Sequence, residues 1–311
     1  MTAGDNHQNL PGAKDASYVG ARIMLVALCL IWGNTWPMMK IALNEMPPLT
    51  MRTLTGLIGA LGLLAICWIR RRSLRIPNGA ALAHVVAASF LNVIAFSLFS
   101  AFAQIAAATS RVAILTYTMP IWTLVLAWAF LGERPTRMQT TAIVLCGIGL
   151  VVLVGPLATK GVPLGLVLAM LSGFSWAAGT VYLKWARIPG DPVGMATWQM
   201  IIAFFVIVAV TQVVDGGLDL RNVYAGGWLA LLFVGLAGNA IAYALWFDIV
   251  ERVPALTATL GIVGIPVLGV LSTMLIIGDR LTPADSIGFA FIFAASVCAQ
   301  IPASVLRRAI G

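Results

Sequence analysis

Charged side chains are scarce in this sequence. Only 10% of the 311 residues are Asp, Glu, Lys or Arg, whereas 60% are hydrophobic and the mean hydropathy is +0.97. Soluble domains carry about 25% charged and roughly 45–50% apolar residues. Apolar runs of about 20 residues, the length that crosses a bilayer, recur along nearly the whole chain. The composition predicts an all-α integral membrane protein and leaves no room for a soluble catalytic domain.

Residue types that build catalytic and metal sites are also few. The chain has two histidines, His7 and His84, and its four cysteines all lie inside apolar runs. It contains no GxxxxGK[ST] phosphate loop, no HExxH, no Cys/His metal cluster and no GxSxG turn. We therefore expect no cofactor, no metal, no enzyme activity and no pumping driven directly by ATP.

The apolar runs, with Gly and Pro between them, predict ten transmembrane helices. Their expected ranges are 22–43, 48–69, 79–102, 107–130, 137–155, 163–186, 192–214, 226–249, 254–277 and 283–305. Residues 1–21 are polar and lack the apolar core of a secretory signal. We expect them to form a short disordered cytoplasmic tail.

The basic residues predict the orientation. The formal net charge is +8, and with both termini in the cytoplasm most Lys and Arg residues, such as those in RRRSLR at 70–75, fall on the cytoplasmic side. This topology and anionic inner-leaflet lipid account for the basic excess, so we expect no nucleic-acid partner. We expect a multi-pass protein of the cell (inner) membrane whose partners are the bilayer and a small-molecule substrate, with no obligate protein partner.

The two halves of the sequence resemble each other. The matching pairs, separated by 144 to 147 positions, are Trp32/Trp176, Lys40/Lys184, Asn92/Asn239, Phe96/Tyr243, Phe99/Trp246 and Glu133/Asp279. Each half holds five predicted helices, an odd number, so the second half must insert upside down relative to the first. We predict two inverted repeats, residues 22–155 and 163–305, around a site near the midplane that opens alternately to either side.

Several motifs carry a family resemblance. WGNTWPMMK opens the first helix, PLTMR opens the second, and the fourth runs through Pro120 into LGERPT before a Gly-rich fifth. Over residues 22–305 the chain resembles the drug/metabolite transporter superfamily in its ten-helix EamA-type branch. The resemblance implies export of small metabolites, with amino acids and their relatives prominent.

Two departures from the family pattern bear on the solute. Arg52 matches the arginine that often opens the second helix in this family, but Ala196 holds the corresponding place in the second half. Related four-helix multidrug exporters carry a glutamate in their first helix, whereas this chain has no acid between Arg22 and Asn44. This shortage of buried acids speaks against export of cationic drugs.

Interior polar and aromatic residues are the candidates for substrate binding, because an amide beside an aromatic ring can fix a ligand's polar end and stack its body. They are Trp32, Asn34, Trp36, Lys40, Asn92, Phe96, Ser100, Tyr117, Trp176, Lys184, Asn239, Tyr243 and Trp246. Each has a structural alternative. Lys40 can reach the outer interface or pair with Glu45, the asparagines can bond neighbouring helices, and aromatics can anchor helix ends.

The sequence thus predicts a secondary transporter that exports small metabolites by alternating access, foremost amino acids with aromatic or other apolar side chains. An exporter of drugs or other small organic solutes is the alternative. A membrane-embedded enzyme is the alternative of another class, and it would require a clustered acid, histidine or metal site at one membrane face.

Overall fold

A computed structural model describes residues 11–158, 163–252 and 264–300, and all regular elements in these ranges are helical. They are α1 (Pro11–Glu45), α2 (Pro48–Ile69), α3 (Gly79–Ser89), the π-helical η1 (Phe90–Ala95), α4 (Phe96–Ala106), α5 (Thr109–Thr116), α6 (Met119–Leu131), α7 (Arg137–Ala158), α8 (Leu164–Ala186), α9 (Pro192–Val214), α10 (Ala225–Leu232), the π-helical η2 (Phe233–Ile241), α11 (Ala242–Arg252), α13 (Gly264–Ile277) and α14 (Pro283–Gln300).

All ten predicted ranges contain an apolar helix. Within the described residues, 8 spans are long and apolar enough to cross a membrane, and Gly264–Ile277 and Pro283–Ala299 form two shorter apolar helices. The start of the ninth predicted range, 254–263, and the end of the tenth, 301–305, lie outside the described residues. The prediction of an all-helical membrane protein is confirmed.

The first helix is longer than predicted. It begins at Pro11, so residues 11–21, expected to be disordered, continue α1. Proline is favoured in the first turn of a helix, where its missing N–H costs no hydrogen bond. Once the apolar span is helical, adding further residues gains one backbone bond each and avoids the cost of nucleation.

The fourth predicted helix, 107–130, is interrupted. α5 ends at Thr116 and α6 begins at Met119, with a turn at Tyr117 and Thr118 between them. The physical cause is Pro120, which has no N–H for the Thr116 carbonyl and whose ring clashes with that turn. The candidate residue Tyr117 therefore lies at a helix break.

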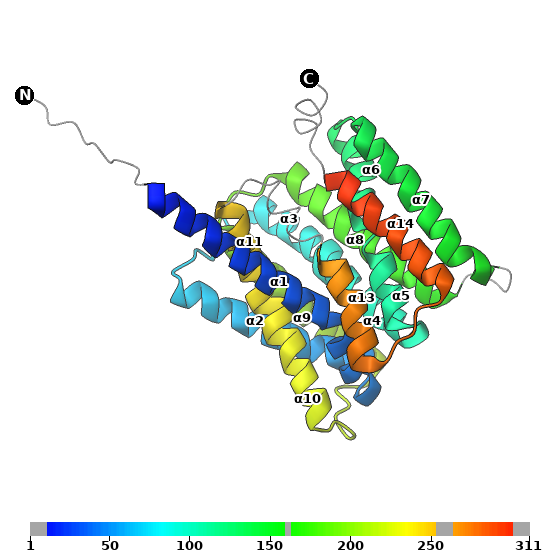
Figure 1. The fold of residues 1–311 in the computed structure, drawn as a ribbon. Coiled ribbons are helices and arrows are strands. Elements are labelled where there is room, and N and C mark those ends of the chain that lie inside the picture. The colour runs from blue at the N-terminus through cyan, green and yellow to red at the C-terminus, as the bar shows by residue number, and fades with distance from the viewer. Residues whose placement is uncertain (1–10, 159–162, 253–263, 301–311) are drawn as a thin grey trace, which may run out of the picture.

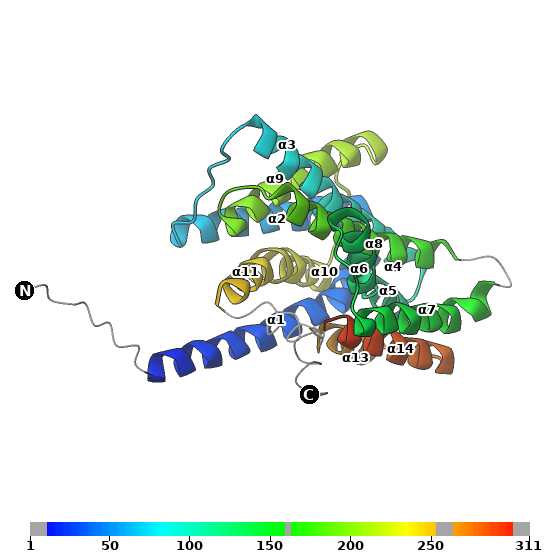
Figure 2. The same ribbon diagram turned by 90° about the horizontal axis from the view of Figure 1, so that it is seen from above.

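The predicted halves interlock. Figure 2 shows α1, α13, α14 and α7 along one side of the bundle, α2, α9 and α3 along the other, and α10 and α11 between α1 and α2. The most extensive helix pairings are α7 with α14, α1 with α13, α2 with α9 and α4 with α8. Each pairing joins the predicted first half to the second, so the interface between them runs through the whole bundle (Figure 1).

Two π-helical segments lie at related positions of the two halves. Asn92 is in η1 and its predicted counterpart Asn239 is in η2. A π-helical turn inside an α-helix is rare and is frequent at functional sites. Both asparagines open the same short pattern, NxIA at 92–95 and at 239–242, and a π-helical segment around each of them supports the predicted duplication.

Ion pairs join the halves at both ends of the bundle. We call the end where α1 begins the near end, and the end where α1 finishes at Glu45 the far end. At the near end Arg70 and Arg72, which follow α2, both contact the carboxylate of Asp248 in α11. At the far end the Arg111 guanidinium in α5 donates to both carboxylate oxygens of Asp285 in α14, at 2.7 and 3.0 Å.

The far-end pair should contribute measurably to stability. The Asp285 side chain is only 2% exposed, so replacing its partner by Arg111→Met leaves a buried carboxylate without a cation. We expect the free energy of unfolding to fall by about 3 kcal/mol, measured by denaturant unfolding in detergent micelles. Arg221→Met is the matched control, because Arg221 pairs with Asp219 at the exposed surface, and it should leave stability unchanged. Equal stabilities of the two variants would contradict the assignment.

Candidate functional site

Five of the candidate aromatic residues form one continuous group, which we call the aromatic layer. Measured between ring centroids, Trp32 lies 6.1 Å from Tyr243 and 6.3 Å from Trp246. Trp176 lies 6.1 Å from Tyr243 and 5.0 Å from Phe96. These separations are those of attractive aromatic pairs. The rings come from α1, α4, α8 and α11, two helices from each predicted half.

The contacts in the aromatic layer are themselves repeated. Trp32 of α1 packs on Tyr243 of α11, and their predicted counterparts Trp176 and Phe96 pack on each other. The central contact, Trp176 with Tyr243, joins these two pairs. Two equivalent pairs therefore meet at the interface between the predicted halves.

The two asparagines are held by neighbouring helices. The Asn239 amide donates to the Thr55 carbonyl at 3.2 Å, and the Asn92 amide is 3.5 Å from the Gln199 side-chain oxygen. The buried Asn92 Oδ1 has no hydrogen-bond partner among the described residues. Both amides thus bond neighbouring helices, which was the structural alternative to substrate binding. The Asn92 side-chain oxygen remains available as an acceptor.

Trp36 and Tyr117 form a second pair at the helix break. The Trp36 indole N–H donates to the Tyr117 hydroxyl at 3.2 Å, and both side chains are buried. Pro37, which follows Trp36 directly, has no N–H to donate to the Gly33 carbonyl one turn earlier in α1. That carbonyl instead accepts a 3.0 Å bond from the Ser272 hydroxyl of α13. The proline therefore fastens α1 to α13.

Lys40 and Ser100 lie in a third group, at the far end. The Lys40 ammonium donates to the Gln104 carbonyl of α4 at 2.9 Å. Its suggested partner Glu45 instead accepts from the backbone N–H groups of Tyr224 and Gly227 at the start of α10. Lys40 therefore reaches a neighbouring helix of the bundle, and the pairing with Glu45 does not form.

Arg52 is a buried residue that was not among the predicted substrate-binding residues. Its side chain is 6% exposed, and one guanidinium nitrogen contacts Met39 Sδ and Ser100 Oγ, each at 2.7 Å. Among the described residues no carboxylate pairs with it, and its Nε has no partner. The signal that could have identified it was present in the sequence, since the corresponding position in the second half is Ala196.

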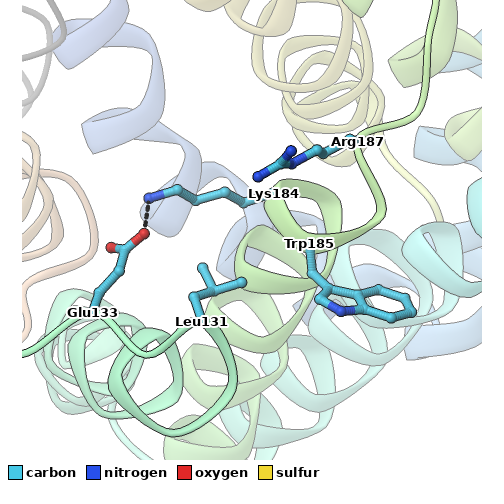
Figure 3. Close-up of a pocket in the computed structure, with 5 residues that line it drawn as sticks. All are labelled: Leu131, Glu133, Lys184, Trp185 and Arg187. Atoms are coloured by element: carbon cyan, nitrogen blue, oxygen red, sulfur yellow. Dashed lines mark hydrogen bonds and ion pairs between the residues drawn. The ribbon is translucent and has the colours of Figure 1, made fainter.

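Lys184 and Asn34 lie apart from the aromatic layer. At the near end a cavity of about 490 Å³ is lined by Leu131, Glu133, Lys184, Trp185 and Arg187 (Figure 3). Its Lys184 and Glu133 are paired at 2.5 Å. Lys184 follows Trp176 by eight residues, or about 12 Å along α8. Asn34 donates to the Leu30 carbonyl of its own helix, on an exposed face.

Comparisons with known proteins agree with this architecture. A family model described as EamA-like transporter family matches residues 20–155 and again 163–299. One solved structure, titled only as a crystal structure of a protein, has a TM-score of 0.64 and 19% identity, and the match covers 94% of this chain and 99% of that one. At this identity the likeness shows the fold.

Curated relatives match over most of their length. The uncharacterized transporter YoaV of Bacillus subtilis is 24% identical over 83% of this chain and 89% of its own. The uncharacterized inner membrane transporter YedA of Escherichia coli K12 is 25% identical over 88% of each chain. A probable amino-acid metabolite efflux pump of the same strain is 22% identical over 87% of this chain and 91% of its own. The matched family model covers both halves, and this multi-pass membrane protein belongs to the EamA-like transporter family.

Proposed function

We propose that this protein is a secondary transporter that exports small metabolites by alternating access, and that its preferred solutes are amino acids with aromatic or other apolar side chains. The observation that carries the proposal is the aromatic layer, where rings from both halves meet. Transporters with inverted repeats bind solute near the midplane at the interface of the repeats. Aromatic faces there would stack the apolar body of a solute.

Amino acids are favoured over cationic drugs by the distribution of acids. The two acidic side chains buried in the described part of the chain, Asp248 and Asp285, are both paired with arginines at the ends of the bundle. Neither is free to hold a cation, whereas Arg52 and Lys40 offer positive charge. The relative named as a probable amino-acid metabolite efflux pump supports the same class of solute.

The predicted topology assigns the two ends of the proposed export pathway to the two sides of the membrane. With basic residues such as Arg70 and Arg72 at the near end, that end faces the cytoplasm by the positive-inside rule. Solute would enter from the near end, cross the aromatic layer and leave at the far end.

The two ends of the bundle differ as alternating access requires. Lys184 is paired with Glu133 at the near end. The corresponding residues at the far end are Lys40 and Asp279, and they bond other partners: the Gln104 carbonyl and the Ser110 backbone N–H. In the opposite state of an inverted repeat the two arrangements exchange, so that Lys40 pairs with Asp279 and the near end opens.

Transport should be seen with the purified full chain in liposomes. We expect saturable flux and counterflow for one or more apolar amino acids among the twenty, tested with and without a proton gradient. Trp32→Ala removes the ring that links α1 to α11, and flux should fall about tenfold, as expected when stacking of about 1.4 kcal/mol is lost. Trp68→Ala is the control, because Trp68 is 83% exposed. The absence of flux for every amino acid, or equal flux in both variants, would refute the proposal.

The near-end ion pair should bias the conformational equilibrium. Spin labels at Arg134→Cys and Arg187→Cys, in a chain whose native cysteines are replaced by alanine, report the near-end distance. Glu133→Gln should raise the long-distance population by up to about fivefold, because an exposed pair contributes only about 0.2–1 kcal/mol. Asp279→Asn should not open this end. Identical distance distributions for Glu133→Gln and the parent would rule out the exchange.

A further inference from the structure

Arg52 is a buried cation that pairs with no carboxylate in the part of the chain that the structure describes. It lies in the second turn of α2, 94% of its surface is covered, and its contacts in the described chain are a sulfur and a hydroxyl. Its Nε makes no hydrogen bond. Burying a guanidinium is costly unless an anion or several acceptors replace its water. A negatively charged ligand bound next to this side chain would therefore be stabilising.

Gln104 adds an unsatisfied amide on the same side of α4. Its side chain is fully buried, and neither Nε2 nor Oε1 has a partner among the described residues. Gln104 follows Ser100 by four residues, so the two lie on one face of the helix. Arg52 contacts the Ser100 hydroxyl, and the Lys40 ammonium donates to the backbone carbonyl of Gln104. Lys40 of α1 and Arg52 of α2 therefore both contact the segment of α4 between Ser100 and Gln104, where the Gln104 side-chain amide makes no hydrogen bond to the described residues.

The fold itself does not require this arginine. The corresponding position in the second half holds Ala196, which is also buried, at 5% exposure. An alanine thus fills the same place near the start of α9, the helix that corresponds to α2. The charge at Arg52 needs an explanation other than packing.

The distance to the aromatic layer fits a small solute. Phe96 of the aromatic layer precedes Ser100 by four residues and Gln104 by eight, all on one face of α4. At 1.5 Å per residue, the level of Phe96 is about 6 Å from that of Ser100 and about 12 Å from that of Gln104. An arylalkyl carboxylic acid, whose ring and carboxylate are a few bonds apart, spans the shorter of these distances.

We propose that Arg52, Ser100 and Gln104 form a carboxylate-binding subsite for the transported solute, next to the aromatic layer. Arg52 Nε and the Gln104 amide N–H donate to the carboxylate, the Ser100 hydroxyl holds the guanidinium in place, and Lys40 adds positive potential from α1. The apolar body of the solute then lies on the aromatic layer. This subsite rests on the proposed function and names the solute group it recognises: a carboxylate, not a cation or a neutral amide.

Thermal unfolding of the full chain in lipid-free detergent tests the subsite, because phospholipid headgroups are then absent as competing anions. The probes are 3-phenylpropionate and 3-phenylpropionamide, which share ring and length but differ in charge. We expect only the carboxylate to raise the unfolding temperature of the parent. In Arg52→Met its half-saturating concentration should rise ten- to hundredfold, the effect of losing charge-assisted hydrogen bonds. Arg221→Met, an exposed arginine control, should respond like the parent.

Gln104→Met separates binding from folding. Replacing an unsatisfied amide with an apolar side chain of similar size should not lower the unfolding temperature of the free protein, while the half-saturating concentration of carboxylate should rise about tenfold. If Gln104 had only a structural role, Gln104→Met would lower the unfolding temperature of the free protein and leave the half-saturating concentration of carboxylate unchanged. The subsite is refuted if Arg52→Met responds like the parent, or if the amide stabilises the parent as well as the carboxylate does.

The liposome assay distinguishes failure of the subsite from failure of the proposed function. If Arg52→Met transports amino acids as fast as the parent, the proposed transport function stands and the subsite is refuted. If carboxylate binding depends on Arg52 but no amino acid is transported, the subsite stands and amino-acid export is refuted.

Discussion

The need to satisfy every backbone polar group away from water shapes this structure most strongly. Helices meet that need along each span, and a proline interrupts it. In α1 the carbonyl freed by Pro37 belongs to Gly33, and Ser272 of α13 supplies its hydrogen bond. In the fourth span Pro120 divides α5 from α6, and a Cβ at Gly173 of α8 would come 2.7 Å from the Thr116 carbonyl oxygen. The two interruptions are thus places where one half is fastened closely to the other.

These fastenings bring the aromatic layer together. α1 and α4 come from the first half and α8 and α11 from the second. The layer forms because α1, α4 and α8 each turn one large ring, and α11 turns two, toward the same interface. Rings are suited to this position because they present apolar faces at low entropic cost and interact edge to face. In the proposed pathway these faces would stack the apolar body of the solute.

The charged residues differ between the two predicted halves. Arg52 has Ala196 as its counterpart, and Lys40 and Lys184 bond different partners although they occupy equivalent positions. A perfectly symmetric bundle would bind a solute equally from both orientations and would favour neither end. One unmatched guanidinium near the far end gives the proposed pathway a chemical preference. The exposed Lys184 and Glu133 pair, weak by its exposure, can close the near end reversibly.

Much of this architecture follows from the sequence alone. Hydropathy and Gly/Pro punctuation predicted all ten apolar helices, because a span in lipid requires about 20 apolar residues and has few alternatives. Matching residues at a nearly constant separation predicted duplication, and they named the five rings of the aromatic layer. They left open whether the asparagines bond neighbouring helices or a solute, and they did not predict that Asn34 bonds its own helix or that Trp36 bonds Tyr117, because residue type does not specify which face meets which neighbour. Nor did they place Arg52 in the candidate site. Residue type identifies a cation, but only the packing of α1, α2 and α4 determines that this charge is buried and that no carboxylate among the described residues pairs with it.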